Sequence, residues 1–319
     1  MNRAILLCGI PGCGKSTHAR KLYEEAIADG TEARIFSSDA IREELYGDES
    51  IVGDSKEVFR IMNERFIKYV EAHPNATAIY DATNLTVKTR KAWIAMLKKS
   101  STVCHFECHF IACRISECKR RQFSRDRQVP EEVIERMVRQ FQAPFYNEGW
   151  DTIRIIVGGK LYDLTEEHLN CWETSHDNPH HELTIGSHMA TARREAIPLI
   201  DALGYGAAAI DAAYHHDIGK PHVKAFVNAR GEPTSEAHYY SHESVSAYMY
   251  LSSDHGEENI DKVLTTASLI QWHMIPYFVT PRGEEPTREG LEEWQNKHHF
   301  RPEFINLLWV VHQADQEAH

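Results

Sequence analysis

The sequence lacks the features of a protein that coats long nucleic acid or crosses a membrane. Its 319 residues include 47 acidic but only 35 basic side chains, a formal net charge of -12, which disfavours a broad basic binding face. No apolar run approaches the roughly 20 residues of a membrane helix, and no signal-peptide pattern precedes the first apolar run at residues 4–7. We therefore expect a cytoplasmic protein without a membrane partner.

Paired cysteines with a metal-type spacing are also absent. Seven cysteines is an odd number, and four of them lie in or just after an apolar stretch that predicts a buried strand: Cys104, Cys108, Cys113 and Cys118. This placement indicates packed free thiols in a reducing compartment.

Up to about residue 159, short apolar runs alternate with amphipathic stretches. The runs predict five strands, at residues 4–9, 33–38, 76–83, 102–112 and 152–158. Alternation of this kind indicates a parallel sheet covered by helices, an α/β fold.

After Gly158 and Gly159 the strand pattern stops. Helical runs follow, for example at residues 207–221, 259–274 and 304–316, with Gly- and Pro-containing loops between them. The sequence therefore predicts an α/β domain at 1–159, a polar linker at 160–179 and an all-α domain at 180–319.

The segment after the first strand predicts a nucleotide site. It matches G-x-x-x-x-G-K-[ST], in which backbone N–H groups and the positive end of the next helix hold phosphates. We expect Lys15 to reach the β- and γ-phosphates of ATP or another NTP, and Ser16 to bind Mg²⁺. The nucleotide-binding residues would be Gly9, Gly12, Gly14, Lys15, Ser16 and Thr17. A chance Gly-rich turn is the alternative, which the preceding strand and the following helix disfavour.

A kinase also needs a base for the acceptor hydroxyl, and a carboxylate at the C-terminal end of a parallel strand is well placed for this role. Asp39 has that position, and Arg42 would lie on the same side of the next helix and hold an anion of the acceptor. Asp81 and Asn84 follow the next strand in the same crevice. The simpler alternatives are that Asp39 caps a helix starting at Ala40 and that the other two residues form a turn.

A basic segment follows the fourth strand, where P-loop kinases place lids. Arg121, Arg125 and Arg127 precede a helix that begins at Pro130. Arginines that close over a transferring phosphoryl group stabilise its charge. A solvated charged helix is the alternative.

About half of the chain resembles the polynucleotide 5′-hydroxyl kinase family. Four motifs carry the resemblance: G-x-P-G-x-G-K-S-T, S-D-x-x-R, D-A-T-N and R-x-x-x-R-D-R-x-V-P. The resemblance implies that Asp39 is the general base and that Arg42 binds the phosphate beside the acceptor nucleoside. It also implies catalytic lid arginines at Arg121 and Arg125, and an acceptor crevice lined by Asp81 and Asn84. Small-molecule and toxin kinases share much of this pattern, and Arg42 is what favours a polynucleotide.

The second half is rich in histidine, of which the chain has 20. His216 and Asp217 are adjacent near the end of a predicted helix, so both can lean toward one ion. Four more candidate ligands lie within or beside predicted helices: His188, His242, His273 and Asp315. Imidazole and carboxylate together suit a first-row divalent metal, and two metals sharing Asp217 would activate water for attack on a phosphate. Taken singly, each histidine is more often a core or surface residue than a metal ligand.

This order of residues resembles the HD phosphohydrolase superfamily from about residue 180 to the end. The resemblance implies one metal at His188, His216, Asp217 and Asp315, and a second at His242 and His273, with Mn, Ni, Co, Fe or Mg as the ion. Lys220, in H-D-x-G-K, would meet the substrate phosphate. The segment N-P-H-H-E-L-T-I-G-S-H also resembles HD domains of bacterial tRNA nucleotidyltransferases, which implies a phosphate or metal contact at His181. No role is assigned to the remaining histidines, His176 among them.

The two halves together resemble HD-polynucleotide kinase fusions. They predict an RNA or nucleic acid end-repair enzyme, a 5′-hydroxyl kinase with a metal-dependent 2′,3′-end phosphatase or cyclic phosphodiesterase, with a separate ligase as a further partner. One alternative is a small-molecule or nucleoside kinase with an HD nucleotide phosphohydrolase. Another is an HD binding module that regulates the kinase. A switch-type ATPase is disfavoured because no apolar run ends in Asp-Glu.

Overall fold

The chain folds into two compact units. The computed structural model describes residues 1–48, 51, 53–100, 102–124, 128–178, 183–201, 206–281 and 284–318. The first unit comprises 1–137 and 148–161, and the second comprises 138–147 and 162–319. Among the helices in the described ranges, none combines the length and apolarity needed to span a bilayer.

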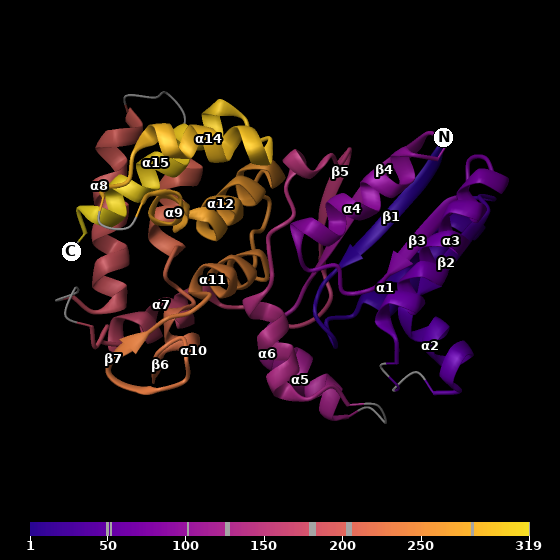
Figure 1. Cartoon of the computed structure of the whole chain (residues 1–319), viewed down its shortest axis with the longest axis horizontal. Coiled ribbons are helices and arrows are strands. Elements are labelled where there is room, and N and C mark those ends of the chain that lie inside the picture. The colour runs from indigo at the N-terminus through magenta and orange to yellow at the C-terminus, as the bar shows by residue number, and fades with distance from the viewer. Residues whose placement is uncertain are drawn as a thin grey trace. The chain divides into compact units, whose positions relative to one another are not determined.

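A five-stranded parallel sheet forms the centre of the first unit (Figure 1), with strand order β2-β3-β1-β4-β5. Its strands are β1 (Asn2–Cys8), β2 (Ala33–Ser37), β3 (Thr77–Asp81), β4 (Cys104–Ala112) and β5 (Thr152–Val157). Each apolar run predicted as a strand forms one, so the α/β prediction is confirmed. Because the strands are parallel, their carboxyl ends lie at one edge of the sheet, where ligands of such folds bind.

Helices cover both faces of this sheet. Ile5 and Leu7 of β1 pack against α1. The pleat turns alternate residues to the other face, where Trp93 of α4 lies 5.7 Å from Tyr80 and 5.4 Å from Phe66 of α3, measured between ring centroids. Burial on both faces explains why β1 reads as an unbroken apolar run. The helices are α1 (Lys15–Ala28), α2 (Ser38–Tyr46), α3 (Ser55–Ala72), α4 (Val87–Lys98), α5 (Ile115–Phe123) and α6 (Glu131–Arg139), with a short 3-10 helix η1 (Tyr146–Glu148) further along.

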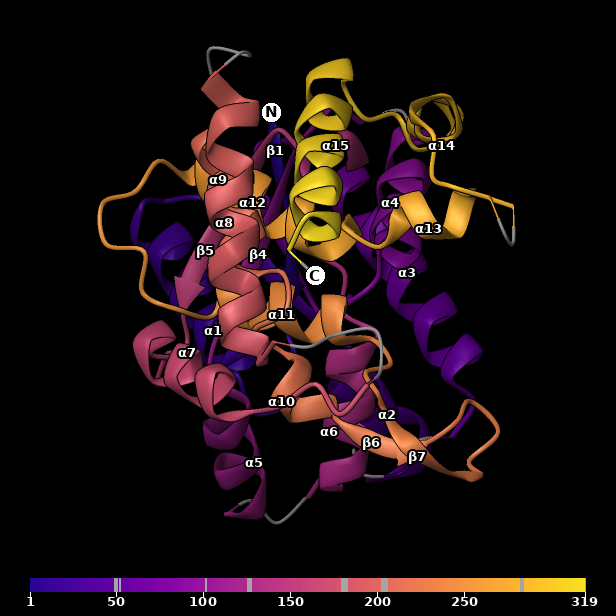
Figure 2. The same ribbon diagram turned by 90° about the vertical axis from the view of Figure 1, so that its left-hand side faces the viewer.

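The second unit is mostly helical, as the sequence predicts. Helices α8, α9 and α15 lie side by side in Figure 2, and α9 also packs against α12. The helices are α7 (Leu164–Glu173), α8 (Ile185–Asp201), α9 (Ala207–His215), α10 (Lys220–Val223), α11 (His242–Leu251), α12 (Ile260–Trp272), α13 (Ile275–Val279), α14 (Arg288–His298) and α15 (Pro302–Gln316).

Two elements of the second unit differ from the expected pattern. A two-stranded antiparallel hairpin, β6 (Ala225–Val227) and β7 (Pro233–His238), interrupts the helices. Its strands are short and largely exposed, so they leave no apolar run to detect. Residues 160–179, expected to join the domains, contain α7, whose Cys171 is buried and lies 3.8 Å from the carbonyl oxygen of Ile218.

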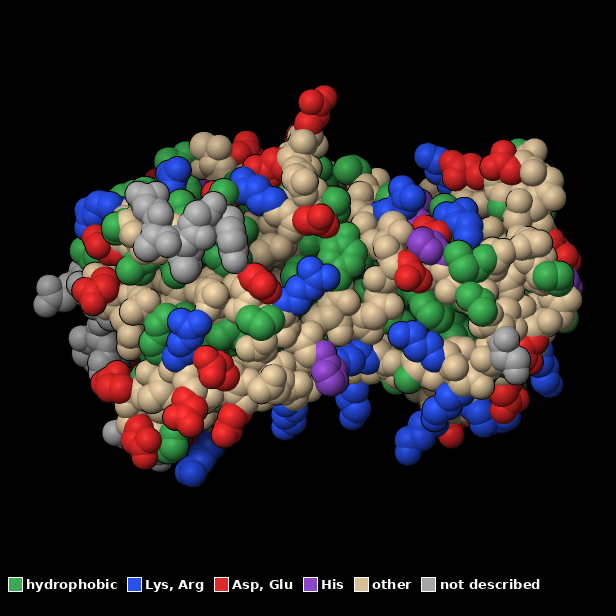
Figure 3. Space-filling view, turned by 90° about the horizontal axis from the view of Figure 1, so that it is seen from above, with side chains coloured by type: hydrophobic (Ala, Val, Ile, Leu, Met, Phe, Trp, Pro, Cys, Tyr) green, Lys and Arg blue, Asp and Glu red, His purple; other side chains and the backbone are tan. Residues whose placement is uncertain are grey.

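The state of the cysteines and the distribution of surface charge can be compared with what the composition predicts. All seven cysteines are free and buried, including the four that were predicted to be packed thiols. On the face shown in Figure 3, Lys and Arg side chains lie among Asp and Glu, and the described residues there form no continuous basic surface.

Candidate functional site

The loop between β1 and α1 leaves its backbone open to an anion. Gly12 and Gly14 have φ angles of 84° and 107°, in the left-handed region that favours glycine. A Cβ at Gly12 would lie 2.5 Å from the carbonyl oxygen of Cys118, so a side chain does not fit there. The Lys15 ammonium donates to the carbonyl oxygen of Ile10 across the loop, at 2.9 Å. This arrangement, followed by the start of α1, suits a phosphate.

Asp81, at the end of β3, lies beside this loop. Burial raises the pKa of its carboxyl, and the Lys15 ammonium and a hydrogen bond with Ser16 oppose that rise. A carboxylate next to a serine hydroxyl offers the hard oxygen ligands that Mg²⁺ prefers. Asp81 therefore lies next to Lys15 and Ser16, and its expected role in the acceptor crevice stays a prediction.

Asp39 and Arg42 form a pair at the start of α2. The hydroxyl of Ser37 caps this helix, because it accepts from the backbone N–H groups of Asp39 and Ala40 at 3.2 and 3.4 Å. The Asp39 side chain is thus not needed as the cap. It is 48% exposed, and its Oδ1 lies 2.9 Å from Nη1 of Arg42. The Arg42 Nε is buried and has no hydrogen-bond partner among the described residues.

The side chain of Asn84 holds the backbone. Its amide nitrogen donates to the carbonyl oxygens of Leu7 and Ala82 at 2.8 and 3.2 Å, which fixes the loop after β3 against β1. Asn84 thus positions this loop, and its expected place in the lining of the acceptor crevice stays a prediction.

A buried ion pair supports the same loop. Arg90 forms a bidentate pair with Glu148, both bonds at 2.7 Å, and donates to the carbonyl oxygen of Asn84 at 3.2 Å. Its side chain is fully buried. This pair was not predictable from the sequence, because partners 58 residues apart share no local pattern.

Arg121, on α5, contacts the phosphate-binding loop directly. Its Nη1 donates to the carbonyl oxygens of Gly158 and Gly12 at 2.8 and 3.4 Å, while its Nε pairs with Glu117 at 2.6 Å. These contacts tie the loop to the end of β5. The other two arginines of the expected lid, Arg125 and Arg127, lie outside the described residues.

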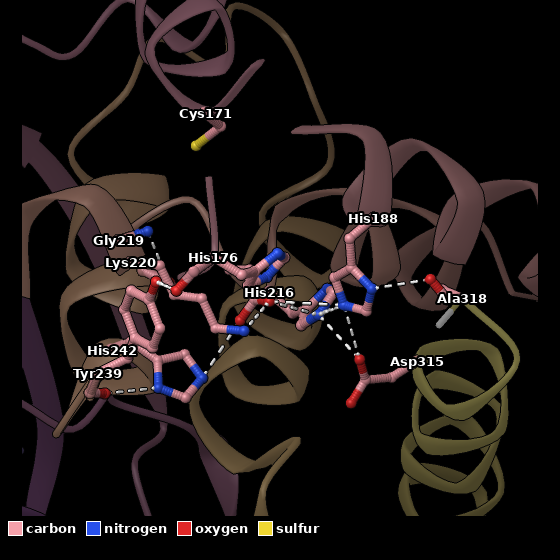
Figure 4. A network of polar contacts seen from close by, with 12 residues as sticks. Cys171, His176, His188, His216, Gly219, Lys220, Tyr239, His242, Asp315 and Ala318 are labelled. Carbon is pink, nitrogen blue, oxygen red and sulfur yellow. Dashed lines mark hydrogen bonds and ion pairs between the residues drawn. The ribbon is translucent and has the colours of Figure 1, made fainter. Parts of the chain in front are cut away.

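Six side chains of the second unit converge in what we call the His/Asp cluster, and Figure 4 labels four of them, His188, His216, His242 and Asp315. They come from α8, the residues directly after α9, the start of α11, the residue after α12, and α15. All six are buried: His188, His216, Asp217, His242, His273 and Asp315. The structure thus brings together the six residues that the resemblance to the HD superfamily implies as ligands of the two metals.

Asp217 lies between two groups of histidines. Its Oδ2 is 3.2 Å from Nε2 of His216 and its Oδ1 is 3.2 Å from Nε2 of His242. On one side, Nε2 of His188 is 2.9 Å from Oδ1 of Asp315. On the other, Nε2 of His242 is 3.2 Å from Nε2 of His273. A carboxylate with one oxygen on each side can serve two neighbouring ions.

Backbone carbonyls fix the tautomer of all four histidines. The Nδ1 atoms lie 2.7 to 3.1 Å from the carbonyl oxygens of Ala318, Ala213, Tyr239 and Ile270. A carbonyl only accepts, so each neutral ring carries its proton on Nδ1 and presents the Nε2 lone pair to the cluster. This is how metal-ligating histidines are oriented.

Both carboxylates of the cluster are held in the ionised form, with pKa values well below the ordinary value. Burial would raise the pKa of Asp217, but His216 and Lys220 hold it well below its ordinary value. Burial would lower the pKa of His216, but Asp217 and Asp315 raise it to about 10. The two carboxylates therefore remain ionised and bind positive charge in the interior.

Two sets of ligand atoms in the cluster lie close enough together to hold an ion. One comprises His188, His216 and Asp315, the other His216, Asp217 and His273, and the atoms of each set lie within 4.8 Å of one another. The donors are imidazole nitrogens and carboxylate oxygens, a set that fits a first-row divalent metal.

The cluster opens into a cavity of about 620 Å³ within the second unit. Lys220 lies in its wall, with Nζ 2.5 Å from Oδ2 of Asp217 and 5.4 Å from the centre of the Tyr239 ring. The lining residues are Asp217, Lys220, Tyr239, Tyr240, Ser241, His242, Glu243, His273, Met274, Tyr277, Phe278 and Asp315. An ammonium next to metal ligands is well placed for a phosphate.

His176 is a neighbour of the cluster that the sequence analysis left unassigned. Its ring lies edge-on to His188, with 5.5 Å between centroids, and its Nδ1 is 2.8 Å from the carbonyl oxygen of Leu183. No motif contains this histidine, and only its burial, at 1% exposure, reveals it. His181, expected as a further contact, lies outside the described residues.

Comparisons with known proteins concern the first half of the chain. Residues 5–144, less than half of the chain, match a family model described as an AAA domain. L-seryl-tRNA(Sec) kinase of Methanococcus maripaludis is 28% identical over 165 residues, which are 51% of this chain and 60% of that protein. Adenylyl-sulfate kinase of Deinococcus deserti is 34% identical over 104 residues, 32% of this chain and 55% of that protein. This chain thus spans less than two thirds of either relative.

Solved structures similar to this chain include Kti12 of Chaetomium thermophilum in complex with ADP-AlF3. It is 20% identical with a TM-score of 0.39, covering 48% of this chain and 88% of that chain. A gluconokinase from Sinorhizobium meliloti is 15% identical with a TM-score of 0.33, covering 51% and 86%. The first unit is a P-loop domain with kinases among its relatives.

Proposed function

We propose that this protein repairs broken RNA ends with two active sites. The first unit would phosphorylate a 5′-hydroxyl with ATP or another NTP. The second would remove a 2′- or 3′-terminal phosphate or open a 2′,3′-cyclic phosphate. The observation that carries the proposal is that one chain contains both the Asp39–Arg42 pair beside a phosphate-binding loop and a cavity lined by Lys220 and metal ligands. A separate ligase would then join the ends.

In the kinase site, the oxygen of the 5′-hydroxyl would attack the γ-phosphorus of the NTP, and the nucleoside diphosphate would leave. Asp39 would accept the proton of this hydroxyl during the attack. Arg42, with its buried Nε, would hold the phosphate next to the acceptor nucleoside. Lys15 would bind the β- and γ-phosphates, and Ser16 and Asp81 would hold Mg²⁺. When bound, Mg²⁺ neutralises charge on the phosphate oxygens.

In the second site, His188, His216, Asp217 and Asp315 would hold one divalent ion, and His242 and His273 would hold another with Asp217 between them. Such ions lower the pKa of bound water and polarise the phosphate. Lys220 would bind phosphate oxygens through its ammonium. The backbone carbonyls behind the rings would keep the Nε2 atoms directed inward.

Removal of the metal tests the second activity. The protein would be stripped with a chelator, and release of phosphate from an oligoribonucleotide 2′-phosphate would be followed after addition of Mn²⁺, Ni²⁺, Co²⁺, Fe²⁺ or Mg²⁺. The proposal expects no release from the stripped protein and recovery with at least one ion. Equal release before and after stripping would contradict a metal site.

A small-molecule kinase is the second candidate for the first unit, and the similarity to an adenylyl-sulfate kinase favours it. The two candidates differ in the acceptor. Transfer of labelled phosphate to an oligonucleotide 5′-hydroxyl should be far more efficient than transfer to a free nucleoside if the acceptor is a polynucleotide. Equal transfer to both would favour the small-molecule enzyme.

A further inference from the structure

The cavity of the second unit is larger than a phosphate requires. Its volume is about 620 Å³, within the roughly 300–1,000 Å³ of pockets that hold whole small ligands. Part of its lining is the His/Asp cluster and Lys220, which suit a phosphate. The rest is largely aromatic: Tyr239, Tyr240, Tyr277 and Phe278. An enzyme that recognised only the phosphate would need no such wall.

Two of these rings already have partners inside the unit. The Tyr239 hydroxyl donates to the backbone carbonyl of His176, and its ring lies below the Lys220 ammonium. Tyr277 packs edge-on against His312, with 4.9 Å between centroids. Both tyrosines therefore shape the cavity, and Tyr239 also positions Lys220.

The other two rings face the solvent at the cavity. Phe278 is 71% exposed and Tyr240 is 44% exposed. Tyr240 stacks on His238, with 5.4 Å between centroids and 8° between the planes, which orients its ring in advance. Large aromatic side chains left in water beside a binding cavity are typical of a surface that binds another flat, apolar group.

Both rings are close in sequence to cluster residues. Tyr240 precedes His242 by two positions, and Phe278 on α13 follows His273 by five. Each aromatic ring is therefore carried by the segment that also supplies a metal ligand. A ligand with a phosphate at the cluster would have its next group within reach of these rings.

We propose that Tyr240 and Phe278, the aromatic rim, form a stacking subsite for the base of the terminal nucleotide whose 2′- or 3′-phosphate is removed. The inference rests on the proposed function of the second unit and names the part of the substrate that this unit recognises. Every base has a π-face, so stacking selects nucleotides over simple phosphoesters without selecting a base. Recognition by a few contacts at the terminus also agrees with the net negative charge of the chain.

The test compares two oligoribonucleotides that carry a 2′-phosphate and differ only in whether the terminal residue has a base. For the substrate with the base, Tyr240→Ala and Phe278→Ala should each raise KM about tenfold with little change in kcat. For the abasic substrate they should change neither constant. Tyr240→Phe, which keeps the ring, should behave as wild type. Phe226→Ala is the matched control, because Phe226 is 46% exposed but does not line the cavity.

Two outcomes overturn the subsite, namely an equal loss on both substrates and no loss on either. If the wild type hydrolyses no phosphoester, the proposed hydrolase fails, and direct binding then decides the subsite. Adenosine 2′-monophosphate would be titrated into the full chain carrying Lys15→Ala, which disables the phosphate-binding loop. Binding weakened about tenfold by Phe278→Ala would support the subsite without hydrolysis, and unchanged binding would reject it.

Discussion

Each of the four histidines in the His/Asp cluster is oriented by a backbone carbonyl before any ligand arrives. The Nδ1 contacts, at 2.7 to 3.1 Å, leave the four Nε2 atoms directed into the cluster with its two carboxylates. At the scale of single residues, this is the feature that separates a metal site from a group of core histidines. Three of these carbonyls lie three residues before their histidine, whereas the Ala318 carbonyl lies 130 residues after His188. The spacing of the histidines alone does not reveal these contacts, because they depend on how each helix ends and on the fold.

Replacement of His216 should remove metal. In His216→Ala, the metal affinity should fall by more than the roughly 10–100-fold that loss of an outer hydrogen-bond partner costs, because a ligand is lost. The loss of metal affinity would be followed by the metal content per chain and by the rate of phosphate release. His222→Ala is the control, since His222 pairs with Glu167 outside the cavity lining. Metal content equal to wild type in His216→Ala would contradict the ligand assignment.

The Asp39–Arg42 pair makes separate predictions for its two members. Asp39→Asn should lower kcat for 5′-phosphorylation about 10²- to 10⁴-fold, the range for loss of a general base, and leave ATP affinity unchanged. Arg42→Ala should raise KM for an oligonucleotide but not for a nucleoside that lacks the neighbouring phosphate. Steady-state kinetics with both acceptors tests this. An equal effect of Arg42→Ala on both acceptors would show that Arg42 binds another part of the substrate.

At the scale of elements, the parallel sheet places the kinase residues at one edge and was predictable strand by strand. The five apolar runs became the five strands. The roles of individual side chains after those strands were less predictable. Asp81 lies with Ser16 and Asn84 bonds the backbone, since contacts across neighbouring loops decide these roles. The β6–β7 hairpin was missed because its exposed strands lack an apolar pattern.

Because α5 packs against the phosphate-binding loop, we expect Gly12→Ala to weaken nucleotide binding and to lower the stability of the protein. The new Cβ would lie 2.5 Å from the Cys118 carbonyl oxygen, so the loop must shift, and both nucleotide binding and stability should fall, the latter by about 1–3 kcal/mol. Thermal unfolding with and without ATP measures both effects. Gly30→Ala is the control, because Gly30 has a φ of 73° but no atom within 4 Å of its Cβ position. Equal effects of the two variants would contradict a steric role for the loop contact.

Strands β1 and β4 share a buried charge that predicts a dependence on pH. Burial would raise the pKa of Glu107, but hydrogen bonds from His109 and Arg3 lower it from 4.5 to about 2. The ionised carboxylate therefore stabilises the fold above about pH 4.5, and this contribution disappears as the pH falls toward 2.

Glu107→Gln tests this dependence. The variant should be about 2 kcal/mol less stable at pH 7, with a difference from wild type that narrows as the pH falls below 4.5. Urea unfolding at several pH values measures the difference, and Glu24→Gln on the exposed surface of α1 should show none. A difference that stays constant down to pH 3 would contradict the assigned partners.

At the scale of the whole molecule, the chain contains two compact units with chemically distinct sites. The division near residue 160 was expected from the end of the strand pattern, and the cluster was expected from six residues scattered between His188 and Asp315. The fold of the second unit brings them together through five segments, which no local spacing determines. His176 and the Arg90–Glu148 pair were not predictable, because burial and long-range contact alone distinguish them.

The measurement that tests the central claim most directly uses one oligoribonucleotide with a 5′-hydroxyl and a 2′-phosphate. It is incubated with NTP, Mg²⁺ and Mn²⁺, and both ends are analysed in wild type, Asp39→Ala and Asp217→Ala. We expect gain of the 5′-phosphate to be lost only in Asp39→Ala and loss of the 2′-phosphate to be abolished only in Asp217→Ala. If neither end changes in the wild type while a small alcohol or nucleoside is phosphorylated, the protein does not repair RNA ends.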